Sequence, residues 1–91
     1  RGARRNLIAR YDDLVGRGRD DPLPLVARGK VQLRLGDGAA AAKDLKRALD
    51  MADAGNHAMS RREVCVDLAR AYLIDGKLGP ASDALERANL N

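Results

Sequence analysis

Residues 68–88 read LARAYLIDGKLGPASDALERA, two runs of leucine and alanine joined by a glycine-containing segment. Small residues, among them Ala69, Ala81 and Ala84, stand beside leucines at helical intervals, and Gly76 lies between the runs. Apolar residues that recur every three or four positions predict amphipathic helices, and a glycine between two such runs predicts a turn. The stretch therefore predicts a helical hairpin in which small residues allow the helices to approach closely.

Length and composition favour a single all-α domain. The chain has 91 residues, no Trp or Phe and only two Tyr. A domain of this size buries only about 60–65% of the surface that its unfolded chain exposes. Because that burial must come from Leu, Val, Ile and Ala, close-packed helices are favoured over a sheet sandwich.

Local signals place the ends of the expected helices. Turn-forming sequences at 16–22, 36–38, 53–56 and 75–80 divide the chain into segments of helical length. Asp21 before Pro22 is typical of a helix N-cap followed by proline in the first turn. SRRE at residues 60–63 matches a capping box, in which Glu63 reaches back toward the cap.

The chain repeats itself. One apolar helix pattern occurs three times; its copies are Leu7, Tyr11 and Leu14, then Ala41, Leu45 and Ala48, then Ala81, Leu85 and Ala88. The helices that precede the second and third copies also correspond, since Leu25, Gly29 and Gly36 are spaced in the same way as Cys65, Ala69 and Gly76. A repeat with units of this length is typical of a solenoid built from helix-turn-helix pairs.

The repeat resembles the tetratricopeptide repeat (TPR) family. In the later unit the matching residues are Leu68, Ala69, Tyr72, Gly76, Ala81, Leu85 and Ala88, with Cys65 where the family often has Trp. In the unit at 22–52 they are Leu25, Gly29, Gly36, Ala41, Leu45 and Ala48, but Arg28 replaces the family's Leu and Gln32 its Tyr. The resemblance implies an all-α, right-handed α-solenoid of antiparallel helix hairpins, with about two and a half repeats and five helices.

We expect one TPR-like domain over residues 1–91. Residues 3–18 would form the second helix of a partial repeat, 21–54 a full repeat, and 58–91 another repeat after an extended inter-repeat segment. We expect the helices there to be lengthened, with a longer loop between them. Because the chain begins at Arg1 rather than Met, we expect it to be a piece of a longer protein. Its composition, rich in Ala, Arg, Gly and Asp, is typical of a bacterial source.

The resemblance also implies where a partner binds. In TPR proteins the first helix of each hairpin lines a concave groove that holds a peptide or a partner helix. The positions on that face are Val26, Lys30, Arg34, Glu63, Val66, Asp67, Arg70 and Ile74. Lys30, Arg34 and Arg70 would form a basic strip suited to an acidic partner, and the alternative is that they are ordinary solubilising charges. Val26 and Val66 stand where chaperone-binding members have a clamp lysine, so we do not expect that specificity.

We therefore predict a non-catalytic protein–protein interaction scaffold. The alternative is a self-association or regulatory segment of a larger multidomain enzyme or transcription regulator. A homodimer would then form through an apolar face at the end of the last helix, at Leu85, Ala88 and Leu90. No catalytic, cofactor-binding or metal-binding residues are expected.

Charge and the reactive residue types exclude several other functions. The formal charge is +4, and the excess lies in residues 1–34, which carry nine Lys/Arg against four Asp. Without interleaved aromatics this does not favour nucleic acid as a partner. A single Cys and a single His supply no zinc site and no internal disulfide; we expect Cys65 in the core, although a reactive thiol remains an alternative, and His57 in a loop. Asp12–Asp13 and Asp20–Asp21 are expected on a helix surface and at a cap rather than as catalytic pairs.

No apolar run approaches the roughly 20 residues that span a bilayer. We expect no membrane segment and a cytoplasmic location, with the periplasm as the alternative.

Overall fold

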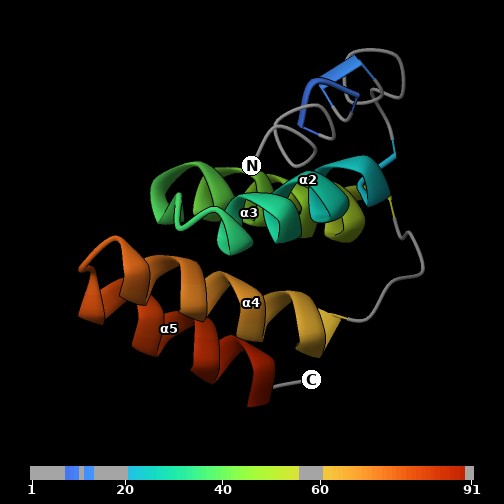
Figure 1. The fold of residues 1–91 in the computed structure, drawn as a ribbon. Coiled ribbons are helices and arrows are strands. Elements are labelled where there is room, and N and C mark those ends of the chain that lie inside the picture. Colours follow the sequence, from blue (N-terminus) through green and yellow to red (C-terminus); the bar gives the residue numbers. More distant parts are fainter. Residues whose placement is uncertain (1–7, 11, 14–20, 56–60, 90–91) are drawn as a thin grey trace.

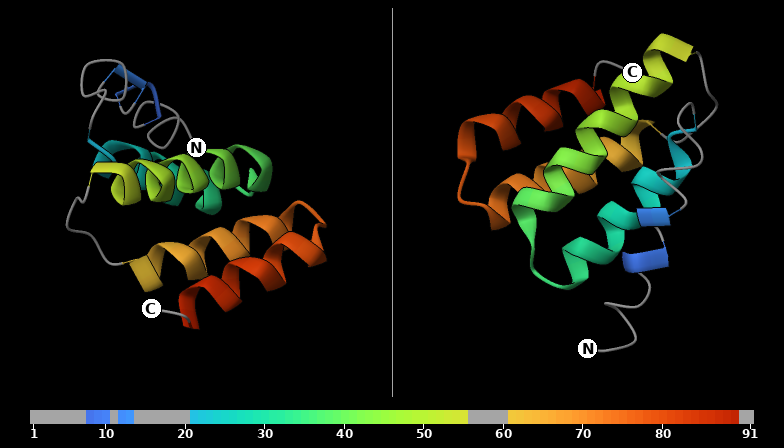
Figure 2. Two further views of the ribbon diagram at one scale, coloured as in Figure 1. Left: turned by 180° about the vertical axis from the view of Figure 1, so that it is seen from behind. Right: turned by 90° about the horizontal axis from the view of Figure 1, so that it is seen from above.

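The computed structural model describes residues 8–10, 12–13, 21–55 and 61–89. The four helices given in full are α2 (Leu23–Arg34), α3 (Gly38–Gly55), α4 (Arg61–Ile74) and α5 (Leu78–Asn89), and residues 8–10 and 12–13 are also helical. Helices that follow one another pack antiparallel, so α2 pairs with α3 and α4 with α5. Figure 1 shows the two hairpins as two stacked layers, and Figure 2 shows the same layers from behind and from above. The all-α prediction is confirmed.

Both hairpins turn in the same way. Gly36 and Gly76 have φ angles of 79° and 75°, in the left-handed region that glycine enters at little cost. The Gly36 N–H donates to the Leu33 carbonyl at 3.0 Å, and the next amide, at Asp37, donates to the Gln32 carbonyl at 2.9 Å. This is a Schellman motif, which satisfies the last carbonyls of a helix.

The turn after α4 has the same two bonds, from Gly76 to Leu73 at 3.1 Å and from Lys77 to Tyr72 at 2.8 Å. The two glycines predicted at hairpin turns therefore occupy equivalent turns in the two hairpins.

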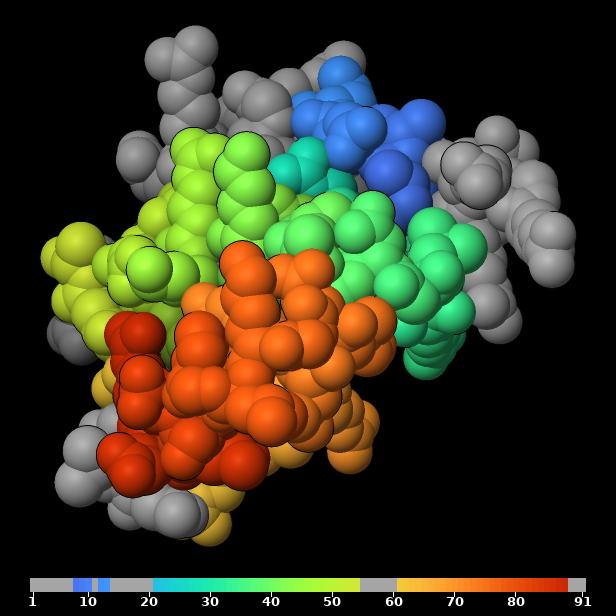
Figure 3. Space-filling view, turned by 90° about the vertical axis from the view of Figure 1, so that its left-hand side faces the viewer, coloured from blue at the N-terminus to red at the C-terminus, as the bar shows by residue number. Residues whose placement is uncertain are grey.

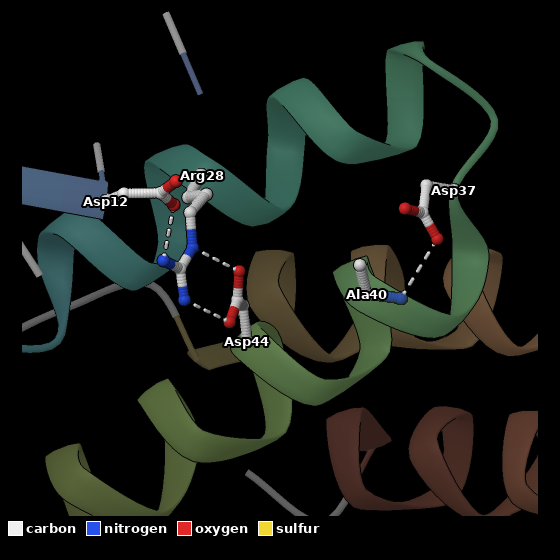
Figure 4. Close-up of polar contacts among 5 residues, drawn as sticks. All are labelled: Asp12, Arg28, Asp37, Ala40 and Asp44. Carbon is white, nitrogen blue, oxygen red and sulfur yellow. Dashed lines mark hydrogen bonds and ion pairs between the residues drawn. The ribbon is translucent and has the colours of Figure 1, made fainter. Parts of the chain in front are cut away.

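The helix starts follow the predicted signals, with one displacement. The Leu23 N–H donates to Asp21 Oδ1 at 3.0 Å, so Asp21 satisfies the first amide of α2, but the N-cap residue is Pro22 and not Asp21 as predicted, because α2 begins at Leu23. At the start of α3, Asp37 Oδ1 accepts from the Ala40 N–H, three residues on, at 3.2 Å (Figure 4). Ser60 of the predicted capping box lies outside the described residues. α3 is the lengthened helix expected before the inter-repeat segment, since it runs 18 residues.

The core lies where α3 packs between α2 and α4. Its members are all aliphatic residues or cysteine; they include Ala41, Leu45 and Leu49 of α3, Cys65, Leu68 and Ala69 of α4, and Ala84 and Ala88 of α5. Gly29 of α2 meets Leu45 so closely that an added Cβ would lie 2.8 Å from Leu45 Cγ. Small residues at the crossings therefore permit the close approach that their spacing predicted.

Arg28, which departs from the repeat pattern, has an internal role. Its guanidinium lies between two carboxylates, with Nε at 2.6 Å and Nη2 at 2.7 Å from the oxygens of Asp44 and Nη1 at 2.7 Å from Asp12 (Figure 4). Asp44 on α3 is only 5% exposed. The arginine thus joins α2 to α3 and to the helical residues before α2.

Candidate partner-binding groove

A cavity of about 210 Å³ lies between the two first helices of the hairpins, α2 and α4. Its lining residues are mainly charged: Lys30, Leu33, Arg34, Glu63, Asp67 and Arg70. Five of these six were predicted for the concave face. They come together here because α2 and α4 both pack on α3 and also contact each other. The cavity is therefore the candidate site for a partner.

One ion pair bridges the groove. Lys30 Nζ on α2 lies 2.6 Å from Glu63 Oε1 on α4. The hydrogen bond and charge of Lys30 hold the pKa of the Glu63 carboxyl below its ordinary value. Both side chains are exposed, so the pair is weak and its partners can be exchanged for those of a ligand.

Asp67 forms the floor of the groove. The residue is 8% exposed, and burial raises the pKa of its carboxyl, against the opposing charges of Lys30 and Arg70. The Arg70 guanidinium, which is well exposed, lies 3.7 Å from the Asp67 carboxylate one helical turn away. Asp67 thus contacts Arg70 directly, whereas Lys30 acts on it only through its charge.

The three cations do not form an uninterrupted basic strip. Lys30 pairs with Glu63 and Arg70 with Asp67, while Arg34 is exposed at the same cavity. The surface is thus a mixed-charge groove in which cations outnumber acids by three to two. In such a groove a ligand carboxylate at Lys30 competes with Glu63 for the same ammonium group.

The remaining residues predicted for this face lie elsewhere. Val26 is half-buried and packs against the core, Val66 is half-buried, and neither lines the cavity. Ile74 is half-exposed, with its Cβ close to Gly38 at the start of α3. Leu33 lines the cavity and was missed; the signal that points to it is its position three residues after Lys30, which places both on one helix face.

The predicted self-association residues differ in exposure. Leu85 is 45% exposed on α5, but Ala88 is buried in the core, so the expectation that it contributes to an exposed face is wrong. Ala88 faces inward because it occupies the same helix face as Ala81 and Ala84, which pack against α4. Leu90 lies outside the described residues. Leu78, 72% exposed at the start of α5, belongs to the exposed surface instead.

The residues considered for chemistry occupy structural positions. Cys65 is fully buried in the core, as predicted, and burial raises the pKa of its thiol, which disfavours the reactive thiolate. Asp12 accepts from Arg28, and Asp21 accepts from the Leu23 N–H at the start of α2. His57 and Asp20 lie outside the described residues, and Asp13 is on the exposed helix surface.

Comparisons of the chain with protein-family models, with curated proteins and with solved structures give no match. In the part of the chain that the structure describes, no three His, Cys, Asp or Glu gather as metal ligands would. No helix among those same residues is both long enough and apolar enough to cross a membrane.

Proposed function

We propose that this chain is a TPR-like helical repeat module that binds a peptide or a partner helix in the groove between α2 and α4. The observation that carries the proposal is the equivalence of Lys30 and Arg70. These cations stand at the same position of two hairpins that have the same turn, and they line one cavity. A repeat that presents equivalent cations along one groove suits an extended ligand with acidic side chains.

The geometry suggests how such a ligand binds. Its carboxylates take the places of Glu63 at Lys30 and add charge-assisted bonds at Arg34 and Arg70, while an apolar side chain contacts Leu33. Both members of the ion pair between Lys30 and Glu63 are in solvent. Replacing Glu63 by a ligand carboxylate at Lys30 therefore costs little free energy. The groove is not catalytic in this proposal, and it needs no cofactor or metal.

Selection from a displayed peptide library tests the proposal. We expect the selected peptides to be acidic and to shift the amide resonances of the groove residues when added to the isotope-labelled chain. Arg34→Glu with Arg70→Glu should weaken binding of a selected peptide by about tenfold or more, since two charge-assisted contacts are lost. Lys43→Glu with Arg47→Glu, on the exposed face of α3, is the matched control and should leave the affinity unchanged.

A peptide whose affinity responds equally to both double variants would contradict groove binding. Peptides without acidic residues, or resonance shifts confined to α5, would contradict it as well.

A second candidate function is self-association through α5, and one comparison within the repeat favours it. Leu45 is 0% exposed on α3, a helix on which both α2 and α4 pack, whereas its equivalent in the second hairpin, Leu85, is 45% exposed on α5. Leu78 adds to the same helix an apolar side chain that is mostly in solvent. If a second copy covers this face, light scattering will show a dimer that Leu85→Glu converts to a monomer. Leu23→Glu, which changes an exposed leucine of α2, should leave the dimer intact.

A further inference from the structure

A second cavity, of about 310 Å³, lies on another side of the molecule, between α3 and α5. It is lined by Lys46 of α3, Leu68 and Tyr72 of α4, and Pro80, Asp83, Ala84 and Arg87 of α5. Figure 3 shows α3 and α5 adjoining on one face of the molecule. The cavity is separate from the groove between α2 and α4, because the two share no lining residue.

The equivalent place in the first hairpin is partly filled. A cavity of about 290 Å³ there is lined by Asp12 and Gln32, the equivalents of Lys46 and Tyr72, but not by Arg28 or Asp44. There Arg28 of α2 extends between Asp12 and Asp44, which come from the helical segments on either side of α2 (Figure 4). The side chain of Arg28 is 18% exposed, so its guanidinium closes the space between those segments. The first hairpin thus holds a cation between two acids at this position.

The second hairpin changes all three members of this cluster. By the spacing of the repeat, Lys46 stands in the place of Asp12, Leu68 in that of Arg28, and Ala84 in that of Asp44. Leucine and alanine are shorter than arginine and aspartate, so the space stays open. Lysine in place of aspartate reverses the charge at its rim, and Lys46 makes no ion pair with another described residue.

The other walls define the shape of a ligand. Leu68 and Ala84 form a buried apolar floor beside the half-buried ring of Tyr72. One lining cation, Arg87, is already held by Asp53, at 2.9 Å. Asp83, an exposed acid on α5, disfavours a second negative charge on the ligand.

We propose that the cavity between α3 and α5 binds a single carboxylate on a short apolar stem, with the carboxylate at Lys46 and the stem on Leu68, Ala84 and Tyr72. A free organic acid and a glutamate side chain share this chemistry. The volume of about 310 Å³ is at the lower end of the range for ligand pockets, which suits a ligand of this size.

Resonance titration of the isotope-labelled chain tests the proposal. Hexanoate and glutamate blocked as amides at both ends are the two probes, and a ligand with about eight non-hydrogen atoms is expected to bind in the millimolar range. We expect at least one of them to shift the amides of Lys46, Leu68, Tyr72 and Ala84 in a saturable way. Tighter binding of hexanoate would identify the ligand as a free organic acid, and tighter binding of the blocked glutamate would identify it as a glutamate side chain. Hexanamide should bind about threefold or more weakly, and hexylammonium more weakly still.

Variants that copy the first hairpin sharpen the test. Lys46→Asp should abolish the preference for hexanoate over hexylammonium, and the triple variant Lys46→Asp, Leu68→Arg, Ala84→Asp should remove binding of both by filling the cavity. Lys43→Asp, one turn earlier on the exposed face of α3, is the matched control. Circular dichroism checks that each variant is helical.

Equal shifts by hexanoate and hexylammonium would overturn the proposal. It would also be overturned if Lys43→Asp weakened hexanoate binding as much as Lys46→Asp, or if neither carboxylate probe shifted the lining residues.

Discussion

Gly38 lies where the start of α3 passes closest to the end of α4. A Cβ added there would lie 2.5 Å from the Ala71 carbonyl oxygen and 2.8 Å from Ile74 Cβ, so the backbones themselves would have to separate. At Gly29 the obstacle is the Leu45 side chain, which can shift in part. At Gly79 an added Cβ meets nothing within 4 Å. Close approach between the hairpins therefore depends most on Gly38.

Alanine substitutions should follow that order. Gly38→Ala should lower the free energy of unfolding by about 1–3 kcal/mol, as overpacking does. Gly29→Ala should cost less, because a helix-propensity gain of about 1 kcal/mol offsets part of the clash. Gly79→Ala should stay within about 0.5 kcal/mol of the parent. Urea unfolding followed by circular dichroism measures all three, and a larger loss at Gly79 than at Gly38 would contradict the close approach.

Asp67 should make stability depend on pH. Burial raises the pKa of this carboxyl above its ordinary value of 3.8, so the folded chain keeps a proton that the unfolded chain releases. The contribution of this group to stability is present at low pH and is lost as the pH rises from 3.8 through the folded pKa. Asp67→Asn cannot ionise. Its stability relative to the parent should therefore increase as the pH rises from about 3.5 to about 7.

Glu63 supplies a control of opposite sign in the same groove. Lys30 lowers the pKa of Glu63 below 4.5, so the carboxylate stabilises the fold at neutral pH, and this effect is lost as the pH falls below that value. Glu63→Gln should lower stability near neutral pH and make no difference in acid. Urea unfolding at the two pH values distinguishes the variants, and the same sign for both would contradict the assignment.

The contact between α2 and α3 depends on an ion pair that the second hairpin does without. Arg28 and Asp44 of the first hairpin correspond to Leu68 and Ala84 of the second, so both members of the contact change together. Asp44 is only 5% exposed, and its pair with Arg28 is bidentate. A buried pair of this kind stabilises the fold only while both partners are present. The departure of Arg28 from the repeat pattern is thus compensated within its own hairpin.

A double-mutant cycle measures this compensation. Arg28→Leu alone should cost about 3–5 kcal/mol, because it leaves a buried carboxylate without its guanidinium. Arg28→Leu combined with Asp44→Ala should recover most of that loss, because the pair then matches Leu68 and Ala84. Arg28→Lys, which keeps the charge but not the two parallel bonds, should give an intermediate loss. Thermal and urea unfolding measure the free energies. If the losses of the two single variants add up to the loss of the double variant, the two residues act independently.

The elements were predictable where the signal is local. Gly36 and Gly76 mark turns because a left-handed residue is needed there, and Asp21 marks a helix start because it caps a nearby amide. The groove was predictable in outline, since helical spacing places Lys30 and Arg34 on one face. Glu63 and Asp67 were predicted for this face, but their ion pairs with Lys30 and Arg70 were not. The first pair joins two helices, and the second depends on the burial of Asp67, so neither follows from the pattern of one helix.

At the scale of the molecule, the helices differ in how many neighbours cover them. α3 packs on both α2 and α4, and α4 packs on both α3 and α5, whereas α5 packs on α4 and, among the described residues, reaches α3 through the ion pairs of Arg87 with Asp50 and Asp53. In a stack of this kind, stability comes from each helix and its nearest-neighbour interfaces. Helices with two interfaces should therefore open less often than a helix with one.

Hydrogen exchange should show this order. In dilute protein, amides in the middle of α3 and α4 should exchange most slowly, because only the rarest opening of the fold exposes them. Amides of α5 should exchange faster, because α5 can detach while the other contacts persist. Exchange followed by resonance intensities or mass spectrometry gives the order directly. Raising the protein concentration should slow exchange in α5 only if a second copy covers Leu78 and Leu85, and Leu85→Glu should then restore the fast exchange. Equal protection of α5 and α3 in dilute protein would mean that the chain unfolds as one unit and that nearest-neighbour coupling does not govern its stability.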